Sequence, residues 1–120
     1  MSPSETQTPF VLVVEDSVLV AMAIEDALQE RGVSVAVAST LAGAIDLVAA
    51  RVPAAALLDI HLPDGESLDL ASRLYGAGCA IAISSAFDAD AIPADFGFAV
   101  QFRKPVSPEV LAEWASGVIG

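Results

Sequence analysis

Five short apolar segments alternate with helix-like segments along the chain, and this alternation limits the folds that are open to it. Strands joined through helices pair in parallel, with right-handed crossovers between them. The apolar segments cover residues 10–14, 33–38, 54–59, 79–84 and 98–102. The sequence therefore predicts a doubly wound α/β sandwich, with a five-stranded parallel sheet between two helical layers. Its simplest strand order is 2-1-3-4-5.

Helical periodicity and capping residues fill the intervals between these segments. Ser17 is expected to cap a first helix that runs to about Arg31 and whose core-facing stripe is Val20, Ile24, Ala27 and Leu28. A second helix is expected over 40–51, with an apolar face of Leu41, Ala44, Ile45 and Val48. A third is expected over 67–75, and Ser107 should cap a last helix that ends near Val118. Residues 87–97 contain three aspartates and Pro93, so a fourth helix there should be short.

The composition is that of one globular domain. Hydrophobic residues make up 55% of the 120 residues and charged residues 18%, so the chain can bury a core. We expect a flexible leader over residues 1–8 and a single domain over 9–120. The longest apolar run, 18–24, is far shorter than the roughly 20 residues of a membrane span, and no signal peptide is recognisable. The single cysteine, Cys79, fits a cytoplasmic protein and a small buried side chain.

The charge balance argues against nucleic acid as a partner. Sixteen acidic residues outnumber five basic ones, which gives a net charge of −11. Nucleic-acid binding depends on Lys and Arg side chains that neutralise phosphates, and five are too few to form a basic stripe. Most of the acidic excess is expected to form a solvated surface, and part of it a metal site.

Carboxylates follow two of the predicted strands. Glu15 and Asp16 come directly after the first strand, and Asp59 ends the third, just before a Pro/Gly turn. In the expected strand order these two strands are neighbours at the switch point of the sheet, so the three side chains should converge. Like charges at such short range require a counter-charge, and Mg²⁺ is suited to carboxylate oxygens and a substrate phosphate.

The ends of the last two strands add a hydroxyl and an ammonium group. Ser84 or Ser85 supplies the hydroxyl, and Lys104 supplies the ammonium. A metal ion, a hydroxyl and a lysine around one carboxylate are the groups that phosphoryl transfer needs. The carboxylate attacks phosphorus, and the cations neutralise the equatorial oxygens. Each residue alone has a plainer interpretation, as a helix N-terminal acid, a turn residue or a solvated strand end.

As a set, these motifs resemble those of the receiver domain of bacterial two-component response regulators, which has a flavodoxin-like fold. The resemblance covers residues 9–119 and rests on four segments: Val13-Val14-Glu15-Asp16, Leu58-Asp59-Ile60-His61-Leu62-Pro63, Ile83-Ser84-Ser85-Ala86 and Lys104-Pro105. It implies a phosphoprotein that signals and that catalyses only its own phosphorylation and dephosphorylation. The partner it implies is a histidine kinase or a histidine phosphotransfer protein.

The resemblance also implies a role for each site residue. Asp59 would accept the phosphoryl group from a phosphohistidine. The ligands of Mg²⁺ would be the carboxylates of Glu15, Asp16 and Asp59 and the backbone carbonyl of His61. The phosphoryl oxygens would be held by Ser85, Ala86 and Lys104, and the Lys104-Pro105 peptide bond is expected to be cis. The His61 side chain would either gate water or project into solvent.

The chain departs from the family's pattern at three positions. The switch aromatic usually lies three residues before the lysine, where this chain has Gln101; Phe102 is one residue late and should face the other side of its strand. Only 18 residues separate Ser85 from Lys104, which again predicts a short fourth helix. Ser67 stands where a glycine often follows the acceptor. The first two departures resemble a subgroup of free-standing receivers that lack the aromatic switch.

An apolar patch on the first helix predicts a docking surface. Helical phase places Val18 and Met22 on the outward face and Leu19 beside them, next to the Asp59 crevice. We expect these residues, with Pro105, to bind the phosphodonor protein, because a contiguous apolar patch commonly marks an interface. The patch could instead pack on the N-terminal leader or on a second copy of the chain, as in a homodimer.

Several functions remain open on the sequence alone. Because the chain ends at Gly120, we expect a stand-alone receiver that signals by protein–protein contact, although excision from a longer hybrid kinase or regulator is an alternative. A metal-dependent phosphohydrolase with an aspartyl nucleophile would carry a second Asp two residues after the first, where this chain has His61. A binding module that is not phosphorylated would have no need of the full set of site residues.

Overall fold

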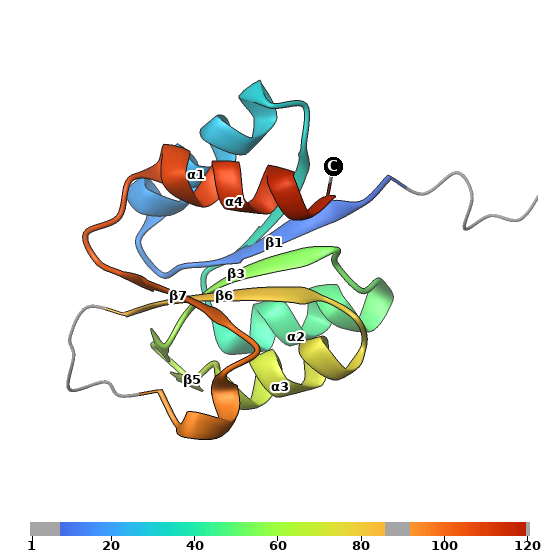
Figure 1. Cartoon of the computed structure of the whole chain (residues 1–120), viewed down its shortest axis with the longest axis vertical. Coiled ribbons are helices and arrows are strands. Elements are labelled where there is room, and N and C mark those ends of the chain that lie inside the picture. The colour runs from blue at the N-terminus through green and yellow to red at the C-terminus, as the bar shows by residue number, and fades with distance from the viewer. Residues whose placement is uncertain (1–7, 86–91, 120) are drawn as a thin grey trace, which may run out of the picture.

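The computed structural model describes residues 8–85 and 92–119 and contains the five-stranded parallel sheet (Figure 1). The strands are β1 (Phe10–Val14), β2 (Ser34–Ala38), β3 (Ala55–Asp59), β6 (Ala80–Ser85) and β7 (Val100–Arg103). Their order is β2-β1-β3-β6-β7, all parallel. Because β6 and β7 are the fourth and fifth strands of the prediction, the predicted order 2-1-3-4-5 is confirmed.

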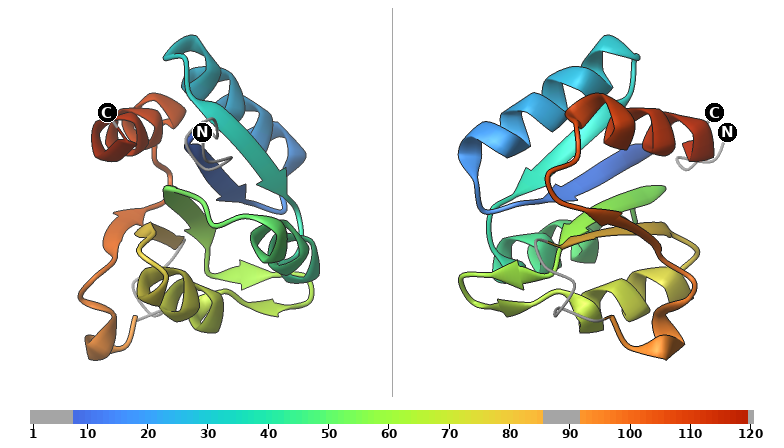
Figure 2. Two further views of the ribbon diagram at one scale, coloured as in Figure 1. Left: turned by 90° about the vertical axis from the view of Figure 1, so that its right-hand side faces the viewer. Right: turned by 60° about the vertical axis from the view of Figure 1, so that its left-hand side comes forward.

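Two pairs of helices cover the two faces of the sheet, which makes the predicted three-layer sandwich (Figure 2). Helices α1 (Val18–Glu30) and α4 (Pro108–Ile119) pack on one face. Helices α2 (Leu41–Ala50) and α3 (Leu68–Gly76) pack on the other. None of the described helices has the length and apolarity that crossing a bilayer requires.

The central strands are buried on both faces, which explains why they are continuous apolar runs in the sequence. In β1, Val11 and Val13 face α1 and α4, whereas Leu12 and Val14 face α2 and α3. Cys79 is buried just before β6, and burial raises the pKa of its thiol to about 12. The expectation of a small buried cysteine is therefore confirmed.

The predicted helix caps are present, but two predicted core positions are wrong. The Ser17 and Ser107 hydroxyl groups accept hydrogen bonds from the first turns of α1 and α4, as predicted, and Thr40 caps α2 in the same way. Val20, predicted to face the core, is 41% exposed, and Ala21 is buried in its place. Ile45 is also exposed, and Leu47 packs on the core instead. Residues 18–24 are apolar on every side of the helix, so periodicity does not fix which side meets the sheet; small Ala21 permits close packing.

The segment before β7 holds only a single 3₁₀ turn, Ala94–Phe96, among its described residues. Residues 87–91 of the predicted short fourth helix lie outside the described part of the chain. Phe98 stacks on Tyr75 at the end of α3, with ring centroids 4.2 Å apart. The amide N–H of Ala99 donates to the Phe96 carbonyl, so β7 begins two residues later than predicted.

A small hairpin that the sequence did not predict lies between β3 and α3. It pairs β4 (His61–Leu62) with β5 (Gly65–Glu66) in antiparallel fashion, beside α2 (Figure 2). Gly65 has a φ of 145°, a conformation that favours glycine. Asp64 at the tip accepts hydrogen bonds from the N–H groups of Leu41 (2.8 Å) and Ala42 (2.9 Å). The hairpin is thereby fixed to the N-terminus of α2.

Candidate functional site

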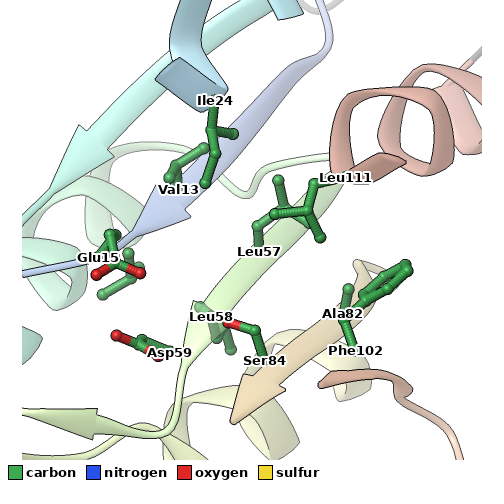
Figure 3. A pocket seen from close by; sticks show the side chains of 11 residues that line it. Val13, Glu15, Ile24, Leu57, Leu58, Asp59, Ala82, Ser84, Phe102 and Leu111 are labelled. Atoms are coloured by element: carbon green, nitrogen blue, oxygen red, sulfur yellow. The ribbon is translucent and has the colours of Figure 1, made fainter. Parts of the chain in front are cut away.

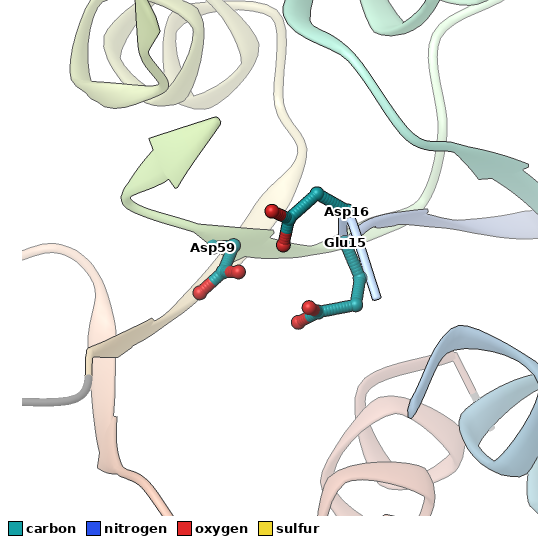
Figure 4. A group of neighbouring side chains, drawn as sticks. All are labelled: Glu15, Asp16 and Asp59. Carbon is teal, nitrogen blue, oxygen red and sulfur yellow. The ribbon is translucent and has the colours of Figure 1, made fainter. Parts of the chain in front are cut away.

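Three carboxylates meet at the carboxyl ends of β1 and β3 (Figure 4). Glu15 and Asp16 follow β1, and Asp59 is the last residue of β3, its neighbour in the sheet. Each offers an oxygen atom, and these atoms all lie within 4.8 Å of one another. Glu15 and Asp59 are buried, whereas Asp16 is exposed. The predicted convergence of these residues is observed.

Glu15 occupies the inner side of this cluster. Its Oε1 accepts a hydrogen bond from the Ser17 N–H (3.1 Å), and its own N–H donates to the Ala38 carbonyl of β2 (3.0 Å). Burial raises the pKa of the Glu15 carboxyl, and the nearby charge of Asp59 raises it further. The hydrogen bond from Ser17 and the ammonium of Lys104 act in the opposite direction without reversing the shift. Glu15 therefore holds its proton more strongly than an exposed glutamate does.

Lys104 is the cation that balances this cluster. Its Nζ lies 2.8 Å from Asp59 Oδ1 and 3.3 Å from Glu15 Oε2. Burial alone would lower the pKa of Lys104, but Asp59 and Glu15 outweigh burial, and the net pKa is raised. Its N–H donates to the Ser85 carbonyl at the end of β6 (2.8 Å), and the Lys104-Pro105 bond is cis, as expected. The ammonium is thus charged and lies against the Asp59 carboxylate.

The two candidate hydroxyl groups stand at the end of β6, next to Asp59 in the sheet. Ser84 is the direct register partner of Asp59 and, with Glu15 and Asp59, lines a cavity of about 10 Å³ (Figure 3). That volume has room for about one water molecule. Ser85 follows at the strand end and is half-buried. Ala86, assigned to phosphate binding from the sequence, lies outside the described residues.

The side chain of His61 lies on the surface of the small hairpin. It is exposed, and its Nδ1 lies 3.5 Å from Glu66 Oε2 across the small hairpin. This geometry agrees with the interpretation in which the side chain projects into solvent. Its backbone is the part of the residue that remains a candidate for the site.

Two residues that support the acceptor loop were missed in the sequence. The Ser67 hydroxyl donates to the Asp59 carbonyl at 2.6 Å, and Asp64 anchors the hairpin to α2. Ser67 was expected only as the start of a helix. Its position, eight residues after the acceptor in place of a glycine, was a signal that this serine does something else.

The aromatic residue near Lys104 lies on the core side of β7, where it lines the small cavity together with Glu15, Asp59 and Ser84. Phe102 packs in the core between the sheet and α4, edge-on to Trp114 with ring centroids 6.5 Å apart. Gln101, at the usual switch position, is exposed. The prediction that Phe102 faces the other side of β7 from Gln101 is confirmed.

The residues predicted to form an outward apolar patch are exposed. Leu19 is 80% exposed and Met22 is 53% exposed; Val18 and Pro105 are also exposed. Pro105 also lines a cavity of about 410 Å³, together with Val20, Ile24, Val106, Leu111, Glu15 and Lys104. The exposure predicted for these residues is therefore observed, and the cavity reaches two residues of the charged cluster, Glu15 and Lys104.

The arrangement fits a hard divalent cation. Mg²⁺ takes carboxylate oxygens and keeps several waters, and here two buried carboxylates and one solvent-facing carboxylate lie within reach of one another. Lys104, whose Nζ contacts Asp59 Oδ1, can balance the additional negative charge of a phosphate bound beside the cation. The fold and the cluster together define a doubly wound domain with a candidate cation site at the switch point of its sheet.

Comparison with known proteins identifies the family. Residues 11–115 match the model of the response regulator receiver domain. The match covers most of the chain, and the chain belongs to this family. No curated protein sequence matches it.

Solved receiver structures share the fold. A CheY-like receiver domain from Methanospirillum hungatei JF-1 has a TM-score of 0.78 at 22% identity, over 94% of each chain. One from Methylobacillus flagellatus has a TM-score of 0.78 at 21% identity, over 93% of this chain and 99% of that one. SdrG from Sphingomonas melonis Fr1 has a TM-score of 0.75 at 24% identity, over 94% and 98%. At these identities the likeness supports the flavodoxin-like fold.

Proposed function

We propose that residues 9–120 of this chain form a receiver that accepts a phosphoryl group on Asp59 from a histidine kinase or a histidine phosphotransfer protein. The observation that carries the proposal is the position of Asp59. It is a buried carboxylate whose Oδ1 lies 2.8 Å from Lys104 Nζ, and oxygen atoms of Glu15 and Asp16 lie within 4.8 Å of it. The ammonium group of Lys104 would offset the repulsion between the Asp59 carboxylate and an anionic phosphodonor. The arrangement therefore suits a carboxylate nucleophile that receives a phosphoryl group.

In the transfer, an oxygen of Asp59 attacks phosphorus while the bond from phosphorus to the donor imidazole nitrogen breaks. The imidazole leaves with the electron pair of that bond. Glu15, Asp16, Asp59 and the His61 carbonyl would hold Mg²⁺, which would neutralise charge between the two anions. Lys104 exchanges its contact with Asp59 for the phosphoryl oxygens. The Ser85 hydroxyl is proposed to donate a hydrogen bond to the same oxygens. Ala86, the next residue, is proposed to contribute to phosphate binding, and Ser84, the preceding residue, is the alternative hydroxyl donor.

The donor protein is proposed to dock on the surface formed by Val18, Leu19, Met22 and Pro105. Pro105 lines the cavity that Lys104 and Glu15 also line, and α1 begins two residues after Asp16, so a donor helix bound at the start of α1 would bring its histidine toward the carboxylate cluster. A flexible methionine suits a contact that adapts to the partner. Contact of this kind would also be the route by which the signal leaves the domain.

Intact mass spectrometry after incubation with acetyl phosphate tests the assignment. The wild-type chain should gain one phosphoryl group with Mg²⁺ and none with excess EDTA, and Asp59→Asn should gain none under either condition. Equal labelling of Asp59→Asn would contradict the assignment. Multiple-turnover release of phosphate from small phosphomonoesters would instead favour a phosphohydrolase.

A further inference from the structure

Ser67 is a buried polar residue that binds the backbone of the acceptor. Its side chain is 0% exposed, and its Oγ donates to the Asp59 carbonyl at 2.6 Å. Its backbone N–H donates to the next carbonyl, that of Ile60, at 3.0 Å. One residue therefore holds two successive carbonyl groups, in the two residues that connect the acceptor carboxylate to His61.

This use of the hydroxyl is made at the expense of the helix that Ser67 begins. Ser67 occupies the N-cap position of α3, yet its side chain makes no capping hydrogen bond. At the corresponding positions of α1 and α2, the hydroxyl groups of Ser17 and Thr40 do accept bonds from the first turn. The hydroxyl of Ser67 points instead toward β3. A serine at a favoured capping position that does not cap has its hydroxyl committed to another partner.

The other anchor of this loop is farther from the acceptor. Asp64 fixes the tip of the hairpin to α2 through the N–H groups of Leu41 and Ala42. That contact sets where the hairpin lies, but it does not touch Asp59. The bond from Ser67 is made to Asp59 itself and, through Ile60, acts on the peptide that leads to the His61 carbonyl.

We infer that Ser67 is a positioning residue for the metal and acceptor site. By holding the Asp59 and Ile60 carbonyl groups, it fixes the orientation of the Asp59 carboxylate relative to the His61 carbonyl. Groups that orient metal ligands from behind have large effects on metal affinity, because a ligand free to rotate must be ordered when the ion binds. The inference rests on the proposed function, since it assigns Mg²⁺ to this cluster.

The test compares Ser67→Ala with the wild-type chain and with Ala71→Gly. Ser67→Ala removes the hydroxyl and little else. Ala71→Gly weakens the same helix one turn farther on, at another fully buried position, and leaves the bond to Asp59 in place. Urea unfolding first establishes that the variants are folded and how much stability each has lost. Mg²⁺ titration followed by NMR or Trp114 fluorescence then gives the dissociation constant of each.

Ser67→Ala should raise the Mg²⁺ dissociation constant about tenfold, and Ala71→Gly should change it less than twofold. The Asp59 carbonyl ¹³C resonance of the metal-free protein should shift in Ser67→Ala and stay in place in Ala71→Gly. With acetyl phosphate, the rate lost in Ser67→Ala should be largely recovered at saturating Mg²⁺.

Three results separate the inference from the proposed function. An unchanged Mg²⁺ affinity of Ser67→Ala, in a chain whose wild type is phosphorylated on Asp59, overturns the role of Ser67 and leaves the function standing. A wild-type chain that binds Mg²⁺ but gains no phosphoryl group overturns the function, while the titration still measures Ser67. A wild-type chain with no saturable Mg²⁺ response overturns both.

Discussion

Lys104 Nζ lies 2.8 Å from Asp59 Oδ1, although the two residues stand at the ends of strands separated by β6. The lysine spans the end of β6 and holds both Asp59 and Glu15. Its single positive charge offsets part of the negative charge of the three carboxylates, and its contact with Asp59 would compete with a metal ion for that carboxylate.

Removing this ammonium should separate metal binding from phosphorylation. Lys104→Met takes away a positive charge that repels Mg²⁺ from Asp59, so the Mg²⁺ dissociation constant should fall several-fold. Phosphorylation by acetyl phosphate should slow at least tenfold, because a cation that stabilises the transferring oxygens is lost. Parallel Mg²⁺ titrations and single-turnover labelling measure both effects. Weaker metal binding in this variant would contradict the competition.

Asp16 should contribute to metal binding without contributing much to the fold. Asp16→Asn removes a ligand from an exposed position, so the free energy of unfolding should change by less than about 0.5 kcal/mol. Mg²⁺ binding should weaken and phosphorylation by acetyl phosphate should slow. Asp46→Asn removes an exposed acid on α2 and serves as the control for net charge. Equal Mg²⁺ titrations of the two variants would remove Asp16 from the site.

A charge placed on the apolar patch should affect the protein donor alone. Met22→Glu should slow phosphotransfer from the cognate donor at least tenfold, or roughly 1.4 kcal/mol. Labelling by acetyl phosphate, which needs no docking surface, should stay near normal. Gln29→Glu adds the same charge to an exposed position farther along α1 and should leave both reactions unchanged. If both reactions slow equally, or neither does, α1 is not the docking surface.

Asp64 should make the stability of the fold depend on pH in a defined direction. Hydrogen bonds from the Ala42 and Leu41 N–H groups hold the pKa of this carboxyl below its usual value of 3.8. A pKa lowered by folding means that the charged form stabilises the folded state above pH 3.8. This contribution is lost as the pH falls through the lower folded-state pKa.

Asp64→Ala should therefore unfold at lower urea than the wild type at neutral pH, and the difference should diminish below pH 3.8. Urea unfolding monitored by circular dichroism between neutral and acidic pH measures this. Asp26→Ala, which removes an exposed acid from the outer face of α1, controls for the change in net charge. A difference that grows on acidification would contradict the assignment.

The sheet was predictable because its strands carry a signal of their own. A strand buried on both faces, such as β1 or β3, must be continuously apolar, and a carboxylate at its end is then conspicuous. The helices between the strands make the pairing parallel, and the simplest order of a doubly wound sheet brings Glu15 and Asp59 together without any knowledge of side-chain packing.

Other features depend on contacts that no local pattern records. Residues 18–24 are apolar throughout, so the choice of Ala21 over Val20 as a core residue is made by the fit of α1 against the sheet. The hairpin β4–β5 has only two residues in each strand, too few for a periodic signal. Ser67 looked like a helix start, but its hydroxyl donates to the Asp59 carbonyl and does not cap α3.

The cavity of about 410 Å³ beside α1 shares a wall with the acceptor, because Lys104 belongs to both. A change in the charge of Asp59 that redirects this lysine alters the wall directly, and Pro105, the next residue, lies on the same wall. Lys104, the residue that contacts Asp59, and Pro105, an exposed residue on the cavity wall, would then be joined by one peptide bond, with no intervening chain of moving side chains. In such a receiver, phosphorylation of Asp59 would change the cavity wall through Lys104 without an aromatic switch. A partner bound in the cavity would in turn change how readily Asp59 is phosphorylated.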